Sequence, residues 1–375
     1  MRLGVDAWGL GGPLAYTGMG QYTLHLLTGI HEVAPDIDVF AYGAPGEQRP
    51  AWLPDAVSWQ APDTRVPPKL AGLVSRLRTV GELARRDGLD VFHAPAVHVR
   101  PSMPPIASVP CPLVATVHDL IPLTFYGATM PVRLRLFYRW NLHRALAAES
   151  VVTVSETARQ EIAGHAPRAK ITVIPNGVEP PAETHARASM LPTCNPYVLY
   201  AGSYEPRKNL VRALDAYAML ATHVDTYDLV AIVDAGSGHE AVARAHLSSL
   251  GIERRVHLVH GLDDAELQAL YAGARVLFFP SLAEGFGLPP LQAAAHGVPV
   301  VASDLPAVRE IMQDAALFVS PRDIAAMAQA LRTAVTDEDL RHRLIAAGYE
   351  RAQEYTWRRS VERHAALYRA VSAQR

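Results

Sequence analysis

Short apolar runs alternate with helical segments along this chain of 375 residues, and the alternation occurs in both halves. In the first half the runs are residues 2–7, 38–42, 90–93, 113–117, 151–154 and 171–174; in the second they are 197–201, 229–234, 256–259, 275–279, 299–302 and 317–320. Such alternation is typical of parallel sheets whose crossover helices cover both faces. The sequence therefore predicts an α/β protein with two doubly wound parallel sheets.

The chain is too long for a single hydrophobic core, so two domains are expected. Residues 175–196 are rich in Pro, Asn, Gly and Thr and show little periodicity, which is typical of a linker. We predict a first domain over 1–178, a linker over 179–196 and a second domain over 197–357. The amphipathic tail, residues 358–375, is expected to form a helix that packs back on the first domain.

Composition excludes several classes of protein. The formal net charge of −2 gives no general electrostatic reason to bind nucleic acid. Cys111 and Cys194 lie far apart, which predicts two buried free thiols in a reducing compartment. The first residues lack the features of a secretory signal, and no apolar run is long enough to span a bilayer. These observations predict a cytoplasmic protein.

The most informative local segment is Glu-Gly-Phe-Gly-Leu-Pro-Pro-Leu-Gln at 284–292. It follows the apolar run 275–280 and precedes a predicted helix, 289–296, with Pro in its first turn. Open α/β sheets bind ligands at the carboxyl ends of their strands. The N–H groups at the start of the helix favour an anion such as phosphate. A carboxylate beside such a site, Glu284, is suited to accept hydrogen bonds from sugar hydroxyls.

Two adjacent cations, Arg207 and Lys208, follow the predicted strand 197–201. They could clamp a diphosphate. The alternative is that they are ordinary solvated surface charges. The use of lysine here, in a chain that uses arginine almost everywhere, favours a specific role.

Three further loops follow predicted strands, and each has both a functional and a purely structural interpretation. Gly18 and Gly20 could bring backbone close to a ligand, or they could only form a turn. His118 and Asp119 could bind hydroxyls or transfer a proton, or they could be a packed histidine and a capping aspartate. His260 could lie near a base, or its loop could be an ordinary connection.

Two other features bear on ligands and partners. No Asp-x-Asp motif is present, and the histidines lack the spacing of metal ligands, so no metal site is expected. A basic aromatic helix is predicted around Arg133, Arg135, Arg139 and Arg144, with Phe137, Tyr138 and Trp140. This helix either rests on anionic lipid or presents an ordinary solvated face.

Seven short motifs occur in order along nearly the whole chain. They occupy residues 17–20, 118–122, 155–156, 174–177, 205–209, 284–289 and 297–303. The ordered set resembles the retaining glycosyltransferase family 4. Within that family the motifs are most similar to those of the bacterial mannosyl- and rhamnosyltransferases of surface polysaccharide synthesis. The resemblance implies the GT-B fold, in which two Rossmann-like domains face each other across a cleft.

The resemblance also implies a reaction. A hexosyl group, with mannose favoured, would move from a nucleoside-diphosphate sugar such as GDP-mannose or a UDP-sugar. The acceptor would be a hydroxyl of a glycan, a lipid-linked glycan or a small molecule. Transfer would occur with retention and without a metal or other cofactor, in the cytoplasm or peripherally at the inner face of the cytoplasmic membrane.

Residue roles follow by position from the same resemblance. Arg207 and Lys208 would neutralise the diphosphate, Glu284 would hold sugar hydroxyls, and His118 would face the sugar from the first half. The remaining predicted donor contacts are Gly18, Gly20, Ser203, His260, Phe286, Gly287, Leu288 and Gln292. Gln292 stands where the family usually has a Glu at the ribose; an amide can still donate and accept hydrogen bonds there.

Two alternative functions remain open at the level of sequence. A nucleotide-sugar 2-epimerase shares the two-domain architecture, but it would need further acid/base carboxylates in the cleft. A non-catalytic nucleotide-sugar-binding subunit of a glycosylation complex would accommodate Gln292, although Glu284 and Lys208 argue against it.

Overall fold

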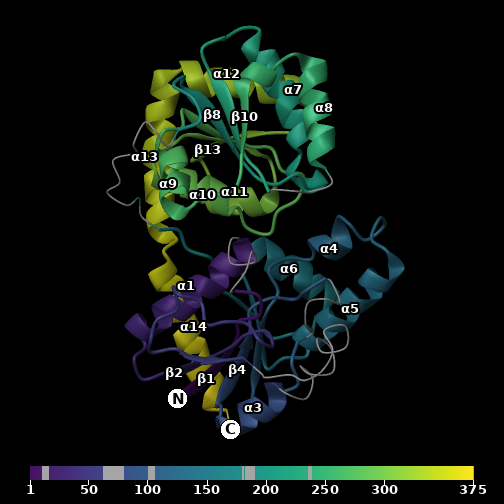
Figure 1. Cartoon of the computed structure of the whole chain (residues 1–375), viewed down its shortest axis with the longest axis vertical. Coiled ribbons are helices and arrows are strands. Elements are labelled where there is room, and N and C mark those ends of the chain that lie inside the picture. Colours follow the sequence, from purple (N-terminus) through teal and green to yellow (C-terminus); the bar gives the residue numbers. More distant parts are fainter. Residues whose placement is uncertain are drawn as a thin grey trace. The chain divides into compact units, whose positions relative to one another are not determined.

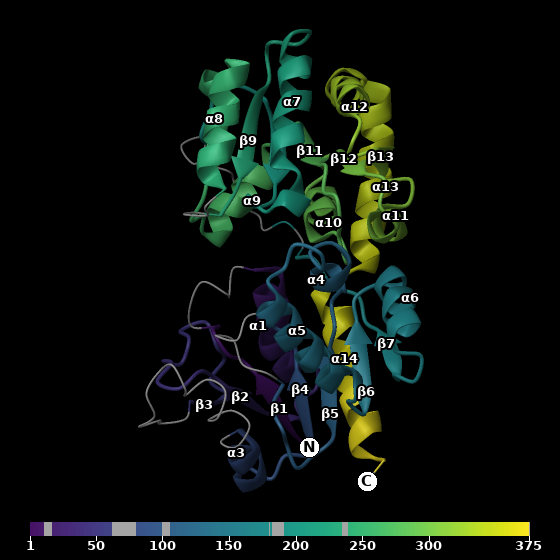
Figure 2. The same cartoon turned by 90° about the vertical axis from the view of Figure 1, so that its right-hand side faces the viewer.

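The computed structural model describes residues 1–10, 17–61, 80–99, 106–179, 181, 191–234 and 239–374 (Figures 1 and 2). The chain forms two compact units, Met1–Gly177 with Trp357–Arg375, and Val178–Thr356. Each unit contains one parallel sheet with helices packed on it. The predicted α/β class with two doubly wound parallel sheets is confirmed.

The sheet of the first unit has its strands in the order β3-β2-β1-β4-β5-β6-β7. The strands are β1 (Arg2–Asp6), β2 (Asp38–Tyr42), β3 (Ser58–Gln60), β4 (Val91–Ala94), β5 (Leu113–Thr116), β6 (Ser150–Thr153) and β7 (Ile171–Val173). The strand order reverses between β1 and β4, so a topological switch point lies at their carboxyl ends. Strand β3 was not predicted, because its residues, Ser-Trp-Gln, do not form an apolar run.

The helices of the first unit cover both faces of its sheet. Those in the described part of the chain are α1 (Gly18–Val33), α3 (Gly81–Arg86), α4 (Ile121–Thr124), α5 (Val132–Leu146), α6 (Glu156–His165) and α14 (Trp357–Ser372). Val114 and Val152 face α1 and α14, whereas their neighbours Ala115 and Val151 face α5. This alternation is the two-residue period of a strand that is buried on both faces.

The second unit has the strand order β10-β9-β8-β11-β12-β13. Its strands are β8 (Tyr197–Ala201), β9 (Asp228–Ile232), β10 (Val256–Val259), β11 (Val276–Phe279), β12 (Val300–Ser303) and β13 (Ala316–Val319). Its helices are α7 (Leu210–Ala221), α8 (Glu240–Leu250), α9 (Asp264–Ala272), α10 (Leu288–Ala295), α11 (Pro306–Met312), α12 (Ile324–Thr336) and α13 (Glu338–Glu354). The order reverses between β8 and β11, which gives this unit its own switch point.

The C-terminal helix belongs to the first unit. Only two residues separate the end of α13 at Glu354 from the start of α14 at Trp357. Helix α14 packs against α1, with Val361, Ala365 and Tyr368 in the same core as the strands. The amphipathic pattern of this segment thus has a partner within the first unit.

Other local expectations had different outcomes. Cys111 is buried but Cys194 is exposed, so the expectation of two buried thiols is wrong for Cys194. That cysteine lies in irregular chain before β8, where no packed element covers it. Residues 69–86 also have helical spacing in the sequence; residues 69–79 lie outside the described part, and α3 occupies the end of this segment. Within the described residues, none of the helices combines the length and the apolar character needed to cross a membrane.

Candidate functional site

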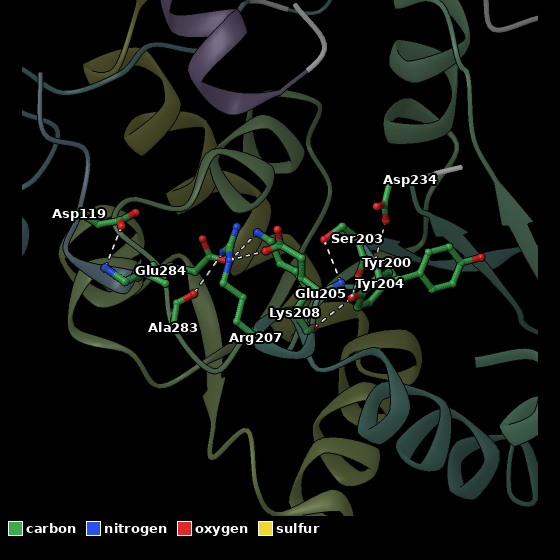
Figure 3. A network of polar contacts seen from close by, with 11 residues as sticks. Asp119, Tyr200, Ser203, Tyr204, Glu205, Arg207, Lys208, Asp234, Ala283 and Glu284 are labelled. Carbon is green, nitrogen blue, oxygen red and sulfur yellow. Dashed lines mark hydrogen bonds and ion pairs between the residues drawn. The ribbon is translucent and has the colours of Figure 1, made fainter. Parts of the chain in front are cut away.

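The strongest polar cluster of the second unit lies at its switch point, where β8 and β11 end side by side. The ammonium Nζ of Lys208 lies 2.7 Å from Oε1 of Glu284, and a guanidinium nitrogen of Arg207 lies 3.3 Å from the same oxygen (Figure 3). Two loops, one after each strand, therefore bring together three of the residues predicted for the donor site.

Backbone contacts hold these two loops together. Residues Pro206–Lys208 form a short 3-10 turn, η4, which ends at Asn209 with a left-handed φ of 63°. The side-chain amide of Asn209 donates to the carbonyls of Pro280 (2.9 Å) and Pro321 (2.8 Å). The N–H of Leu282 donates to the carbonyl of Arg207 at 2.6 Å. The two cations thus stand on a constrained turn rather than a free loop.

The cluster is electrostatically balanced and largely shielded from solvent. The side chains of Glu284 and Lys208 are only 10% and 13% exposed. Burial alone would raise the pKa of Glu284, but Lys208, Arg207 and a hydrogen bond from Ser281 outweigh burial, so the pKa is lowered. Glu284 is therefore a carboxylate at neutral pH and can accept hydrogen bonds from hydroxyls.

Both cations are ion-paired, so the interpretation of Arg207 and Lys208 as solvated surface charges is wrong. Arg207 also donates from Nε to Glu205 at 2.8 Å, and Lys208 lies over the ring of Phe279, 5.3 Å from its centroid. The two cations are balanced by two carboxylates, Glu205 and Glu284, so the cluster carries no net charge. The N–H groups of Arg207 and Lys208 can donate hydrogen bonds to an anionic group placed beside them.

The start of α10 provides two backbone donors. Gly287 precedes the helix with a φ of +118°, a conformation that side-chain-bearing residues rarely adopt. Pro289 and Pro290 carry no N–H, so the first turn offers only the N–H groups of Gly287 and Leu288. The predicted anion site at this helix is therefore narrower than a helix N-terminus with its full set of donors.

The other predicted residues of the second unit lie at varied distances from this cluster. Ser203 accepts a hydrogen bond from the N–H of Glu205 at 3.2 Å. The ring of Phe286 is buried and packs edge-on against Tyr355. His260 follows β10, three strands away from β11, which is roughly 14 Å at the usual strand spacing. It does not join the Glu284 cluster.

Gln292 lies in the second turn of α10, half-buried. Its side-chain amide nitrogen is 3.5 Å from the carbonyl oxygen of Glu179, which is the limit of a hydrogen bond. No stronger side-chain contact holds it in the described part of the chain. The amide is therefore able to reorient toward a ligand.

The sequence reasoning missed Asp234, a carboxylate at the end of β9 next to β8. Asp234 accepts a hydrogen bond from the N–H of Tyr204 at 2.8 Å (Figure 3). It is exposed and stands one strand away from the Arg207–Lys208 turn. The signal that could have revealed it is an acidic residue at the end of the apolar run 229–234.

In the first unit, Gly18 and Gly20 start α1, where the N–H of Gly20 donates to the side chain of Thr17 at 3.1 Å. A small hollow lies there at the switch point of this sheet. It is lined by Asp6, Trp8, Leu10, Thr17, Met19, Gly20, Thr23, Pro95, Ala96 and His98. Gly20 therefore lines a small hollow at the carboxyl end of β1, and Asp6 in the same hollow is a carboxylate that sequence reasoning did not single out.

His118 follows β5 in the same unit. Its Nε2 lies 3.0 Å from the carbonyl oxygen of Pro95, and because a carbonyl only accepts, Nε2 carries the proton. Burial lowers the pKa of His118 to about 4. At neutral pH the imidazole is thus uncharged, with a lone pair on Nδ1, and it can accept a hydrogen bond but is not a proton donor. Asp119 accepts a hydrogen bond from the N–H of Ile121, the first residue of α4, at 2.9 Å.

No group of three or more His, Cys, Asp or Glu side chains suited to hold a metal ion occurs in the described part of the chain. The polar groups of the second-unit cluster are two cations, two carboxylates and two backbone donors. Such a set can bind a phosphorylated sugar through its charges and its hydroxyls.

Comparisons with known proteins agree with this geometry. Residues 16–181 match the family model described as Glycosyltransferase Family 4, and residues 182–351 match Glycosyl transferases group 1. The chain is 31% identical over 256 residues to O-antigen chain mannosyltransferase B of Escherichia coli, covering 65% of this chain and 66% of that protein. It is 29% identical over 360 residues to phosphatidyl-myo-inositol mannosyltransferase of Mycobacterium leprae (strain TN), covering 91% and 89%.

A solved structure extends the likeness to the fold. Sucrose-phosphate synthase from Thermosynechococcus elongatus superposes with a TM-score of 0.79 at 20% identity, and the match covers 100% of each chain. The architecture of two parallel-sheet units is therefore shared over the full length.

Proposed function

Because the chain belongs to glycosyltransferase family 4 and has the GT-B fold, we propose that it transfers a mannose-like hexosyl group from a nucleoside-diphosphate sugar, favouring GDP-mannose. The acceptor is a hydroxyl of a glycan or lipid-linked glycan. The observation that carries the proposal is the cluster of Lys208 and Arg207 around Glu284 at the switch point of the second sheet. The names of the two mannosyltransferase relatives support the choice of sugar.

The cluster is suited to the charge that develops during transfer. Breaking the bond from the anomeric carbon to the diphosphate leaves the electron pair on the diphosphate. Arg207, Lys208 and the N–H groups of Gly287 and Leu288 offer fixed positive charge and hydrogen-bond donors for it. In this role no metal ion is needed, because the protein itself supplies the compensating charge.

Glu284 serves the other end of the donor. As a carboxylate it accepts hydrogen bonds from sugar hydroxyls while Lys208 remains beside it. A lysine that touches both the carboxylate and the diphosphate holds the sugar and the leaving group at a defined separation. The lowered pKa of Glu284 makes it a weak base, which suits hydrogen bonding better than proton abstraction.

Retention of the anomeric configuration is proposed to follow from attack on the face of the anomeric carbon from which the leaving group departs. The acceptor oxygen bonds to the anomeric carbon as the bond to the diphosphate breaks, and the acceptor's proton passes to the departing phosphate oxygen. His118, neutral with its Nδ1 lone pair, accepts a hydrogen bond from a hydroxyl of the sugar. In this mechanism no side chain forms a covalent intermediate.

Helix α5 supports the part of the proposal that places the protein at a membrane surface. Val132, Leu136 and Trp140 lie one turn apart and are 60%, 62% and 41% exposed. Arg133 and Arg139 are exposed on the same side, and the helix contains no acidic residue. An apolar stripe flanked by arginines is the pattern of a helix that lies on anionic lipid. Contact of this kind would bring the enzyme to a lipid-linked acceptor.

The test is a transfer assay with purified protein. Membranes or lipid-linked glycans are incubated with GDP-mannose, UDP-glucose or dTDP-rhamnose, and products are identified by mass spectrometry. The anomeric configuration of the new linkage is read by NMR. We expect transfer from GDP-mannose with retention. Donor conversion without an acceptor would indicate an epimerase, and binding without turnover of any donor would indicate a non-catalytic subunit.

A further inference from the structure

Five hydrogen bonds join buried side chains of β4, β5, α1 and α14 in the first unit. They run from Tyr368 Oη to His93 Nδ1 (2.7 Å), His93 Nε2 to Thr116 Oγ1 (2.8 Å), Thr116 Oγ1 to Tyr22 Oη (2.9 Å), Tyr22 Oη to His364 Nε2 (2.7 Å), and His364 Nδ1 to the Ser360 carbonyl (2.8 Å). None of the five side chains is more than 1% exposed. The network therefore has to satisfy itself without water.

The carbonyl of Ser360 determines the direction of the whole chain. A carbonyl only accepts, so His364 donates from Nδ1, and a neutral imidazole must then accept at Nε2 from the hydroxyl of Tyr22. Since that hydroxyl has no second proton, Thr116 donates to Tyr22. Thr116 in turn accepts from Nε2 of His93. Each group thus donates a hydrogen bond to the next one, from Tyr368 through to the carbonyl of Ser360.

The charges of the network agree with this direction. Burial lowers the pKa of His93 and lowers that of His364 to about 4, while burial raises the pKa values of Tyr22 and Tyr368. Every member is neutral at pH 7, as the assigned donors and acceptors require. The hydroxyl of Tyr22 is therefore held on two sides, by β5 through Thr116 and by α14 through His364.

The ring of Tyr22 lies against His118. The two ring centroids are 5.0 Å apart, with an interplanar angle of 86°. His118 is held on another side by the carbonyl of Pro95. Tyr22 also lies one turn beyond Gly18 and Gly20 on α1, so the anchored ring connects the glycine turn to the histidine loop.

We propose that Tyr22 is a positioning residue, whose anchored ring holds the imidazole of His118 in one orientation and one tautomer, with Nδ1 as the acceptor for a sugar hydroxyl. This inference rests on the proposed function for the role of His118. The ring of Tyr22 covers one flank of the imidazole, and burial disfavours a positive charge on it.

The network also contains a matched control. Tyr368 is as deeply buried as Tyr22 and donates to the same chain, but its ring packs against His93 and His364 rather than His118. If the chain only attaches α14 to the first unit, substitutions at the two tyrosines will have the same consequences. If Tyr22 positions His118, only substitutions at Tyr22 will alter that histidine.

The test is the titration of His118 in protein labelled with ¹⁵N-histidine, followed by proton–nitrogen correlation spectra and assigned with His118→Asn. In wild type we expect a proton on Nε2 and no titration between pH 5 and 8. In Tyr22→Leu we expect the pKa to rise toward 6.5 and kcat to fall about tenfold, with little change in KM. Tyr22→Phe keeps the ring but loses its two anchoring hydrogen bonds, so its kcat is expected to lie between those of Tyr22→Leu and wild type.

Tyr368→Leu is expected to lower the melting temperature as Tyr22→Leu does, while leaving the titration of His118 and kcat unchanged. Equal effects of the two leucine variants on His118, or an unchanged His118 in Tyr22→Leu, would overturn the inference. If Tyr22→Leu does not fold, the inference is tested in the wild-type protein instead. Nuclear Overhauser effects between the rings of Tyr22 and His118 would support their contact, and the absence of these effects would contradict it. These spectra need no substrate, so a protein that passes them but transfers no sugar would contradict the proposed function alone.

Discussion

Lys208 Nζ lies 2.7 Å from Glu284 Oε1, although 76 residues separate the two along the chain. The pair joins the turn after β8 to the loop after β11, and Arg207 shares the same carboxylate oxygen at 3.3 Å. Because both members of the pair are nearly covered, each stabilises the other's charge in the folded protein. The same atoms are the proposed contacts for the leaving group and the sugar, so their contributions to stability and to catalysis must be measured separately.

Lys208→Ala is expected to lower kcat about 100-fold or more, because a fixed cation is removed from the developing charge of the diphosphate. It should also lower the free energy of unfolding by about 1–3 kcal/mol, since a nearly buried carboxylate loses a charged hydrogen bond. Turnover at saturating donor and unfolding in urea measure the two effects. Lys170→Ala, at an exposed lysine of the first unit, should change neither. A near-normal rate for Lys208→Ala would assign the lysine to stability alone.

Glu284 should make stability depend on pH in acid. Its folded pKa lies below the ordinary value of 4.5, so its contribution is present above about pH 4.5 and is lost as pH falls through the folded pKa. Glu284→Gln removes this dependence, and its unfolding free energy should decline less steeply than that of wild type between pH 5 and pH 3. Glu350→Gln, on the exposed side of α13, should follow wild type. Parallel curves for wild type and Glu284→Gln would contradict the expectation.

Gln292→Glu is expected to keep activity and to tighten binding of the free nucleoside diphosphate by a few-fold to about tenfold. A carboxylate accepts hydrogen bonds from ribose hydroxyls more strongly than an amide does. The weak 3.5 Å contact with Glu179 is the only side-chain hydrogen bond of Gln292 that the described residues show, so little is lost by the change. Calorimetry measures the affinities, and Gln329→Glu on α12 controls for the added charge. Equal affinity would assign Gln292 to helix packing, and weaker binding would contradict a ribose contact.

Transfer is expected to continue in excess EDTA, because Arg207, Lys208 and two backbone N–H groups are proposed to take the role that a divalent ion has at other diphosphate sites. The measurement is the initial rate after dialysis against EDTA, with the same protein in Mg²⁺ as reference. A rate that disappears with EDTA and returns only with Mg²⁺ or Mn²⁺ would show that the cations are insufficient.

Leu136→Glu with Trp140→Glu is expected to reduce binding to vesicles that contain phosphatidylglycerol by roughly tenfold or more, since it places two charges in the apolar stripe of α5. Binding to vesicles of phosphatidylcholine alone should be weak for every variant, because the arginines find no anionic lipid there. Val242→Glu, at a 57% exposed position on α8, is the matched control. Co-sedimentation measures the bound fraction. Unchanged binding by the double variant would indicate that α5 is an ordinary solvated face.

Local sequence patterns were enough to predict the class of fold and the loops proposed to bind ligands. The length and continuity of the apolar runs predict parallel strands, because a strand that is buried on both faces has a short, continuous apolar sequence. The motif loops follow these runs directly, so Arg207, Lys208 and Glu284 could be assigned to carboxyl ends of strands from the order of residues alone. The three-residue strand β3 and the exposed Cys194 could not be predicted, because neither depends on a periodic local pattern.

Which of these residues meet depends on the tertiary structure. The order of strands places β8 beside β11, and this long-range choice pairs Lys208 with Glu284 while leaving His260 three strands away. The contact of Tyr22 with His364 spans 342 residues and requires α14 to pack on α1. Local sequence encodes propensity and periodicity, whereas partners across a fold depend on crossover connections and packing of distant elements. For that reason the charged loops were visible in the sequence, but the anchored tyrosine beside His118 was not.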